Sequence, residues 1–178
     1  MKNIFKIRRL CVLAAALAMA TSAQAGSFSS SLPEFSGNGS NGTETWGTMT
    51  FSIPLGEVTT YAFLSGQFGN SVTGSTSVHD VYADGILVAS CPSQSSACWI
   101  SGPNPWSYTF SGSELSIFND GMVVMTTNQI DIYVVREGEL SLRGLTAPIP
   151  EPESYAMLLA GLGLLGGIAR RRKQKLAA

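Results

Sequence analysis

Residues 78–89 read VHDVYADGILVA, and they carry the strongest structural signal in the chain. Residues 78–83 and 86–89 are rich in β-branched and aromatic side chains, and the dipeptide Asp84-Gly85 lies between them. Asp-Gly between two such runs favours a type I′ turn, because both central residues of that turn take positive φ. The pattern therefore predicts an antiparallel hairpin, with His79 as a surface residue of its first strand.

Short strand patterns continue on both sides of this hairpin. Apolar and polar residues alternate over 46–53, and residues 58–68 are β-branched and aromatic. Further strands are expected at 106–110, 115–117, 122–127, 130–135 and 140–142, and residues 26–43 are expected to form a mobile arm or an irregular edge strand. Helical periodicity is absent between residues 26 and 149. About eight short strands with regular turn signals predict an all-β fold, an antiparallel β-sandwich of jelly-roll type.

The first 25 residues have the order of a secretory signal peptide. Four basic residues precede an apolar core at 10–20, and Ala23-Gln24-Ala25 follows as a small-residue cleavage site. We expect a signal helix over residues 1–25 that is cut after Ala25. Export then requires the Sec translocon and signal peptidase.

Residues 150–175 form a third segment after the exported domain at 26–149. A Pro-Glu-Pro turn precedes an apolar run at 155–169 and then a basic cluster. This order predicts a C-terminal transmembrane helix at the short end of the range that can cross a bilayer. The positive-inside rule places the basic cluster in the cytoplasm and the preceding domain on the periplasmic side.

The C-terminal segment resembles the PEP-CTERM sorting signal of exported bacterial proteins, also described as the ice-binding protein C-terminal domain. The residues that carry the resemblance are Pro150, Glu151, Pro152, Arg170, Arg171 and Arg172. The resemblance implies recognition by exosortase, transient anchoring in the inner membrane and delivery to the cell surface of a Gram-negative bacterium. It also implies an association with exopolysaccharide and biofilm. Ice binding is not expected, because the middle domain lacks a regular threonine repeat.

The middle domain is strongly acidic although the whole chain has a net charge of −1. Residues 26–149 contain two arginines, no lysine and ten acidic residues, which gives a net charge of −8. Such a charge repels phosphate backbones and excludes nucleic acid as a partner. The abundant serine, threonine, glycine and asparagine suit either hydrogen bonding to neutral sugars or a surface with no ligand.

Cys91 and Cys98 are the cysteines that remain after signal cleavage. An even pair in an oxidising compartment predicts a disulfide. A redox or metal role is the weaker alternative, because the spacing is not C-x-x-C and His79 is the single histidine. We predict no metal site and no cofactor, and the sequence leaves a structural calcium open.

Aromatic residues near the second cysteine are the best binding candidates. Trp99, Trp106 and Tyr108 lie close to glycines and prolines, and flat aromatic faces can stack on sugar rings. The alternative is that Trp106 and Tyr108 fill the core, because they alternate on one strand face. A catalytic constellation is not recognisable, since no G-x-S-x-G elbow occurs. We expect a non-enzymatic surface protein; a hydrolase of matrix polysaccharide and a purely structural coat protein are the alternatives.

Overall fold

The computed structural model describes residues 25–100, 102–149 and 152–176. It divides into two units, Met1–Ala147 and Pro148–Ala178. The predicted signal helix lies outside the described residues, apart from Ala25. Among the sorting-motif residues, Pro150 and Glu151 also lie outside them.

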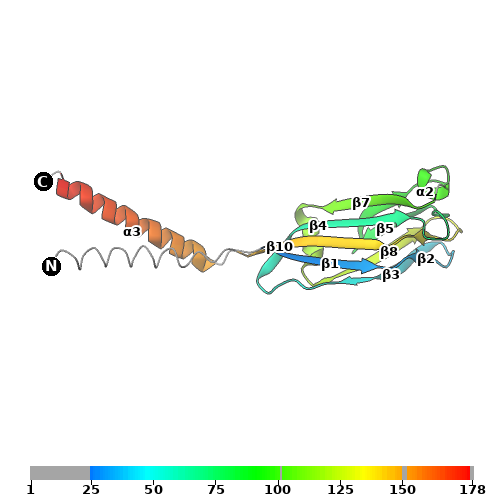
Figure 1. The fold of residues 1–178 in the computed structure, drawn as a ribbon, viewed down its shortest axis with the longest axis horizontal. Helices are drawn as coiled ribbons and strands as arrows, with labels where there is room; N and C mark the ends of the chain where they lie inside the picture. The colour runs from blue at the N-terminus through cyan, green and yellow to red at the C-terminus, as the bar shows by residue number, and fades with distance from the viewer. Residues whose placement is uncertain (1–24, 101, 150–151, 177–178) are drawn as a thin grey trace. The chain divides into compact units, whose positions relative to one another are not determined.

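In the part of the chain that the structure describes, ten strands form two antiparallel sheets that pack on each other (Figure 1). Sheet A has the order β1 (Gly26–Leu32), β10 (Leu140–Pro148), β4 (Glu57–Phe68), β9 (Arg136–Glu137) and β2 (Phe35–Ser36), and β7 (Asn104–Phe110) also pairs with β4. Sheet B has the order β3 (Gly42–Thr50), β8 (Met122–Gln129), β5 (His79–Ala83) and β6 (Ile86–Cys91). The predicted two-sheet antiparallel sandwich is confirmed, and its jelly-roll subtype stays a prediction.

The hairpin at residues 78–89 forms as expected. β5 pairs antiparallel with β6, and Ala83 lies opposite Ile86. Asp84 has φ 45° and Gly85 has φ 81°, so both central residues take the positive φ that a type I′ turn requires. Asp84 also caps the neighbouring strand, because its carboxylate accepts a hydrogen bond of 2.9 Å from the Val124 amide.

The core lies between the sheets and is filled by alternate side chains of each strand. Leu64 on β4 and Leu142 on β10 are almost fully buried, whereas the residues beside them face outward. Phe28 on the edge strand β1 stacks on Phe51 with ring centroids 4.4 Å apart. This stack needs a glycine at position 144, because a Cβ there would overlap the Phe28 ring.

Two predicted strands are wrong. Around Leu115 and Ile117 the chain forms a 3-10 helix, η1 (Gly112–Phe118). The alternation of these two residues imitates a strand, but Glu114 accepts a hydrogen bond from the Ser111 amide, as in a capping box. The run 130–135 was also expected as a strand. There Asp131 accepts hydrogen bonds from the Val78 and Tyr133 amides, which turns the backbone and leaves a strand only at β9.

The second unit consists of the helix α3 (Pro152–Leu176). Pro152 begins this helix, and Arg170, Arg171 and Arg172 lie near its end. Within the described residues, no helix has the length and apolar character needed to cross a membrane. The predicted transmembrane helix is therefore not found.

Candidate functional site

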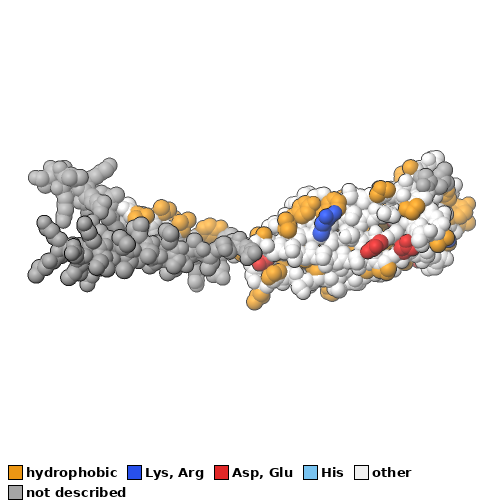
Figure 2. Space-filling model, in the orientation of Figure 1, with side chains coloured by type: hydrophobic (Ala, Val, Ile, Leu, Met, Phe, Trp, Pro, Cys, Tyr) orange, Lys and Arg blue, Asp and Glu red, His pale blue; other side chains and the backbone are white. Residues whose placement is uncertain are grey.

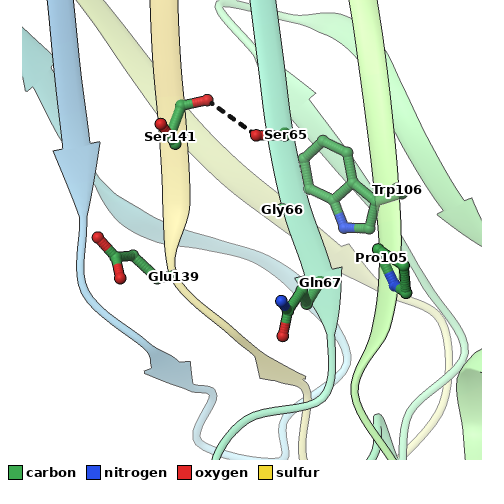
Figure 3. Close-up of a pocket in the computed structure, with 7 residues that line it drawn as sticks. All are labelled: Ser65, Gly66, Gln67, Pro105, Trp106, Glu139 and Ser141. Carbon is green, nitrogen blue, oxygen red and sulfur yellow. Dashed lines mark hydrogen bonds between the residues drawn. The ribbon is translucent and has the colours of Figure 1, made fainter.

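A pocket of about 420 Å³ lies on sheet A, at the end of β4 and the beginning of β10. Figure 3 shows that β4, β7 and the start of β10 all contribute to it. The lining residues are Ser65, Gly66, Gln67, Pro105, Trp106, Glu139 and Ser141. Its polar groups are thus hydroxyls, one amide and one carboxylate.

The geometry of the pocket follows from the strand period of two. Leu64 and Phe68 point into the core, so Ser65 and Gln67 must point away from it. The Ser65 hydroxyl donates a long hydrogen bond of 3.5 Å to the backbone oxygen of Ser141 on β10. Six of the seven lining residues therefore belong to paired strands, and Glu139 lies in the two-residue connection between β9 and β10.

Trp106 contributes to this pocket, but it is also a core residue. Its ring lies 6.1 Å from the ring of Phe68 and directly beneath Gly66, where a Cβ would overlap the indole. Tyr108 does not line the pocket; its hydroxyl donates a hydrogen bond of 2.7 Å to Glu114. Both residues pack against the buried core cluster. The positions of Trp106 and Tyr108 fit the alternative that they are core residues better than the prediction that they stack on sugars from a loop.

Trp99 does not line the pocket. It belongs to the short helix α2 (Ala97–Ile100), and its ring meets that of Tyr133 edge-on at 5.4 Å. Ile132, next to Tyr133, is 77 % exposed. The three glycan-binding candidates from the sequence are therefore not brought together at one place.

The predicted disulfide is confirmed. Cys91 ends β6, and it is bonded to Cys98 in α2 with a Cα–Cα distance of 5.8 Å. The bond joins the end of the hairpin to α2, the short helix that carries Trp99. Among the described residues, no group of three or more His, Cys, Asp or Glu side chains is placed to hold a metal ion.

A buried histidine–glutamate pair connects the two sheets, and the sequence-based prediction for His79 is wrong. His79, at the start of β5, is fully buried, because it lies between Gln129 on β8 and Cys91 on β6. Its Nε2 contacts the carboxylate of Glu137, which is itself fully buried in β9 of sheet A. The ring of Phe68 packs edge-on against the imidazole at 5.6 Å.

The pKa values of this pair are both raised. Burial opposes the charged imidazolium, but hydrogen bonding to Glu137 and the charge of that carboxylate prevail, and the pKa of His79 lies above its ordinary 6.5. Burial raises the pKa of the Glu137 carboxyl, although His79 and the Trp106 indole oppose this shift. The Trp106 indole nitrogen and Glu137 Oε2 are buried and do not reach hydrogen-bond geometry with any described residue.

The hydrogen bonds determine how many protons the pair holds. Nδ1 of His79 lies 2.9 Å from the backbone oxygen of Ser77, and a carbonyl can only accept, so Nδ1 carries a proton. A second proton lies between Nε2 and the Glu137 carboxylate. The folded pair therefore keeps two protons and is neutral as a whole, which is the state that burial favours.

A pH dependence of stability follows from this proton count. Above pH 6.5, His79 and Glu137 together hold one proton in the unfolded chain and two in the folded chain. The stabilisation that the pair gives to the fold is therefore complete below pH 6.5, and it is lost as the pH rises through the folded pKa values. We expect the free energy of unfolding to fall as the pH rises above 6.5, by at most about 1.4 kcal/mol per pH unit, which is the value for one proton. Urea denaturation between about pH 6 and pH 9 measures it, with Glu137→Gln as the variant that should lose the slope. An equal slope in both proteins would contradict the assignment.

Sequence reasoning identified Trp106 and missed the other six pocket residues, among them the polar ones, Ser65, Gln67, Glu139 and Ser141. Each of these four is an ordinary polar residue at or near the end of a strand, and strand order brings them together. The available signal was weak: Ser65 and Gln67 alternate with buried residues in β4.

Residues 148–173 match the PEP-CTERM protein-sorting motif. No curated protein sequence matches the chain. Among solved structures, the ANX2 ectodomain from Arabidopsis thaliana aligns with a TM-score of 0.42 and 11% identity over 63% of this chain and 32% of that one. A family 35 carbohydrate binding module from Clostridium thermocellum aligns with a TM-score of 0.30 and 13% identity over 67% of this chain and 98% of the module. The chain thus covers about a third of the plant ectodomain, and likenesses at these scores carry no argument about ligands.

Proposed function

We propose that this chain, which carries a PEP-CTERM sorting motif, is a surface protein that binds extracellular polysaccharide without cleaving it. It is exported through the Sec translocon, cut by signal peptidase and recognised by exosortase at residues 148–173. The sorting segment holds it briefly at the inner membrane with the sandwich on the periplasmic side. The protein is then delivered to the surface of a Gram-negative cell and functions in its exopolysaccharide matrix.

The pocket on sheet A is the observation that carries the binding proposal. Its volume of about 420 Å³ falls in the range of small-ligand sites and is large enough for about one or two sugar units. Hydroxyl, amide and carboxylate groups line it, and these are the partners that sugar hydroxyls need. Charged side chains are also sparse on the face of the sandwich shown in Figure 2, which leaves most of that face to hydroxyl, amide and backbone groups.

Two other functions are less well supported. Glycoside hydrolysis by the usual mechanisms needs two carboxyl groups about 5–9.5 Å apart, whereas Glu139 is the single carboxylate that lines the pocket in the described part of the chain. This favours binding over cleavage. A purely structural coat protein is the second alternative, and it differs from our proposal in having no affinity for sugars.

Filling the pocket should abolish binding and leave the fold intact. Ser141 is exposed on β10, so Ser141→Trp places an indole in the pocket without disturbing the core. We expect at least about a tenfold loss of affinity, equivalent to about 1.4 kcal/mol, because one sugar unit loses its contacts. The measurement is titration calorimetry with the polysaccharide that gives the strongest signal for the wild-type protein on a glycan array.

A matched variant and an alternative site make this test decisive. Ser27→Trp introduces the same side chain at an exposed position of β1 that does not line the pocket, and it should bind like the wild type. Loss of binding in Trp99→Ala, with Ser141→Trp unaffected, would move the site to Trp99 in α2. A wild-type protein that binds no glycan and no exopolysaccharide would leave the coat-protein alternative.

A further inference from the structure

Glu139 is distinguished from the other acidic residues of the domain by its lack of a partner. Each of the other nine has a hydrogen bond within the sandwich; they are Glu34, Glu44, Glu57, Asp80, Asp84, Glu114, Asp120, Asp131 and Glu137. Within the described residues, Glu139 has neither a hydrogen bond nor an ion pair, and it is exposed at the pocket. Nine carboxylates therefore have structural roles, and Glu139 is the one left available to a ligand.

The backbone beneath Glu139 is held in place, so the carboxylate is presented from a fixed point. The amide of Gly138 donates a hydrogen bond of 2.8 Å to the Gln67 backbone oxygen, and Leu140 is fully buried on the other side. The backbone at Glu139 is thus anchored by both neighbours, and Figure 3 shows the side chain at the β1 side of the pocket, with Ser141, Ser65 and Gln67 between it and β7. Binding through this residue therefore costs little backbone freedom, and the cost that remains is the ordering of the Glu139 side chain.

Neither arginine of the domain neutralises this carboxylate. The guanidinium of Arg143 lies 5.0 Å from the centre of the Phe63 ring, which it covers. Arg143 lies on β10, four residues after Glu139, which corresponds to about 13 Å of extended chain, and it does not line the pocket. The Nε of Arg136 is buried in the sandwich. The charge of Glu139 is therefore uncompensated by any side chain that the structure describes.

We infer that the pocket selects hexose units that carry a free amine, with the ammonium group at Glu139 and ring hydroxyls at Ser65, Gln67 and Ser141. This inference rests on the proposed polysaccharide-binding function. A carboxylate that is covered by a ligand needs compensation for its lost water, and an ammonium supplies a charge-assisted hydrogen bond about twice as strong as one from a neutral hydroxyl. The net charge of −8 acts in the same direction, because it attracts a cationic polymer and repels a uronic-acid polymer.

Two oligosaccharides that differ only in N-acetylation test this preference. The probes are the β-1,4-linked glucosamine tetramer and its fully N-acetylated counterpart, titrated calorimetrically at about pH 6, where a free amine is protonated. We expect the wild-type protein to bind the amine-bearing tetramer at least about tenfold more tightly. Glu139→Gln should bring the two affinities to within about twofold, while affinity for the acetylated tetramer is retained.

Glu34→Gln is the matched control, since it makes the same chemical change and the same change in net charge away from the pocket. Glu34 is held by the Ser71 amide and hydroxyl, so this variant should keep the wild-type preference. Equal loss of preference in both variants would assign it to overall charge and overturn the inference. Equal affinities of the wild-type protein for the two tetramers, or tighter binding of an oligouronate, would also overturn it and leave the proposed function standing. Absence of binding to any polysaccharide would remove the proposed function itself.

Discussion

Replacing Glu137 with leucine should lower the free energy of unfolding by about 3–5 kcal/mol. The substitution leaves the His79 imidazole fully buried with Nε2 unpaired, and removal of one partner from a buried pair has a cost of this size. A small domain has only about 5–15 kcal/mol of stability in total, so much of it would be lost. Urea denaturation followed by tryptophan fluorescence measures the change at about pH 6, where the pair holds both of its protons.

A double replacement separates the pair from simple packing. His79→Leu with Glu137→Leu fills the same space with apolar groups, and this combination should recover most of the lost stability. Glu139→Leu, two residues further along and exposed, should change stability by less than about 0.5 kcal/mol. Wild-type stability in Glu137→Leu alone would show that the pair contributes nothing. The pair joins β5 of sheet B to β9 of sheet A. We therefore expect its main contribution to be that it fixes the position of one sheet against the other.

Removing the disulfide should have the second-largest effect. Cys91 and Cys98 are seven residues apart, and closing a loop of this size stabilises a fold by about 2.5 kcal/mol when the effect is treated as chain entropy. The double variant Cys91→Ala with Cys98→Ala should therefore melt about 10 °C below the wild-type protein. Differential scanning calorimetry with and without a reductant measures this shift.

The reductant supplies the control for the disulfide variant. It should lower the melting temperature of the wild-type protein to that of the double variant, and it should leave the double variant unchanged. The fluorescence of Trp99 should also change on reduction, because α2 is then attached to β6 only through residues 92–96. A double variant that melts with the wild-type protein would show that the loop is rigid without the bond.

The sequence predicted the fold correctly where the turn residues and the alternation of apolar side chains match the observed turns and burial. The Asp84-Gly85 turn and the alternation in β4 both follow from properties of neighbouring residues. The prediction failed at Ile132 and Tyr133, where an apolar run is exposed because Asp131 turns the backbone. Apolar periodicity alone does not distinguish a strand from such a turn.

The candidate site was less predictable for a physical reason. Its lining comes from β4, β7 and β10, which are neighbours in space only because of the strand order. The same holds for His79 and Glu137, which are 58 residues apart, and whose sequence surroundings do not indicate that each is buried against the other. Residues recognisable by type, such as Trp99, were easier to notice than residues whose role depends on arrangement, such as Glu139.

The pairing of β1 with β10 has a consequence for maturation. Gly26 lies opposite Thr146, so the folded domain starts and finishes at the same end, whereas Leu32 lies opposite Leu140, beside the pocket. Proteolytic cleavage before Gly26 and after Pro148 would remove no residue of β1 or β10. Cleavage at either boundary would therefore leave the pairing of β1 with β10 intact, and the pocket lies at the far end of these two strands from both boundaries.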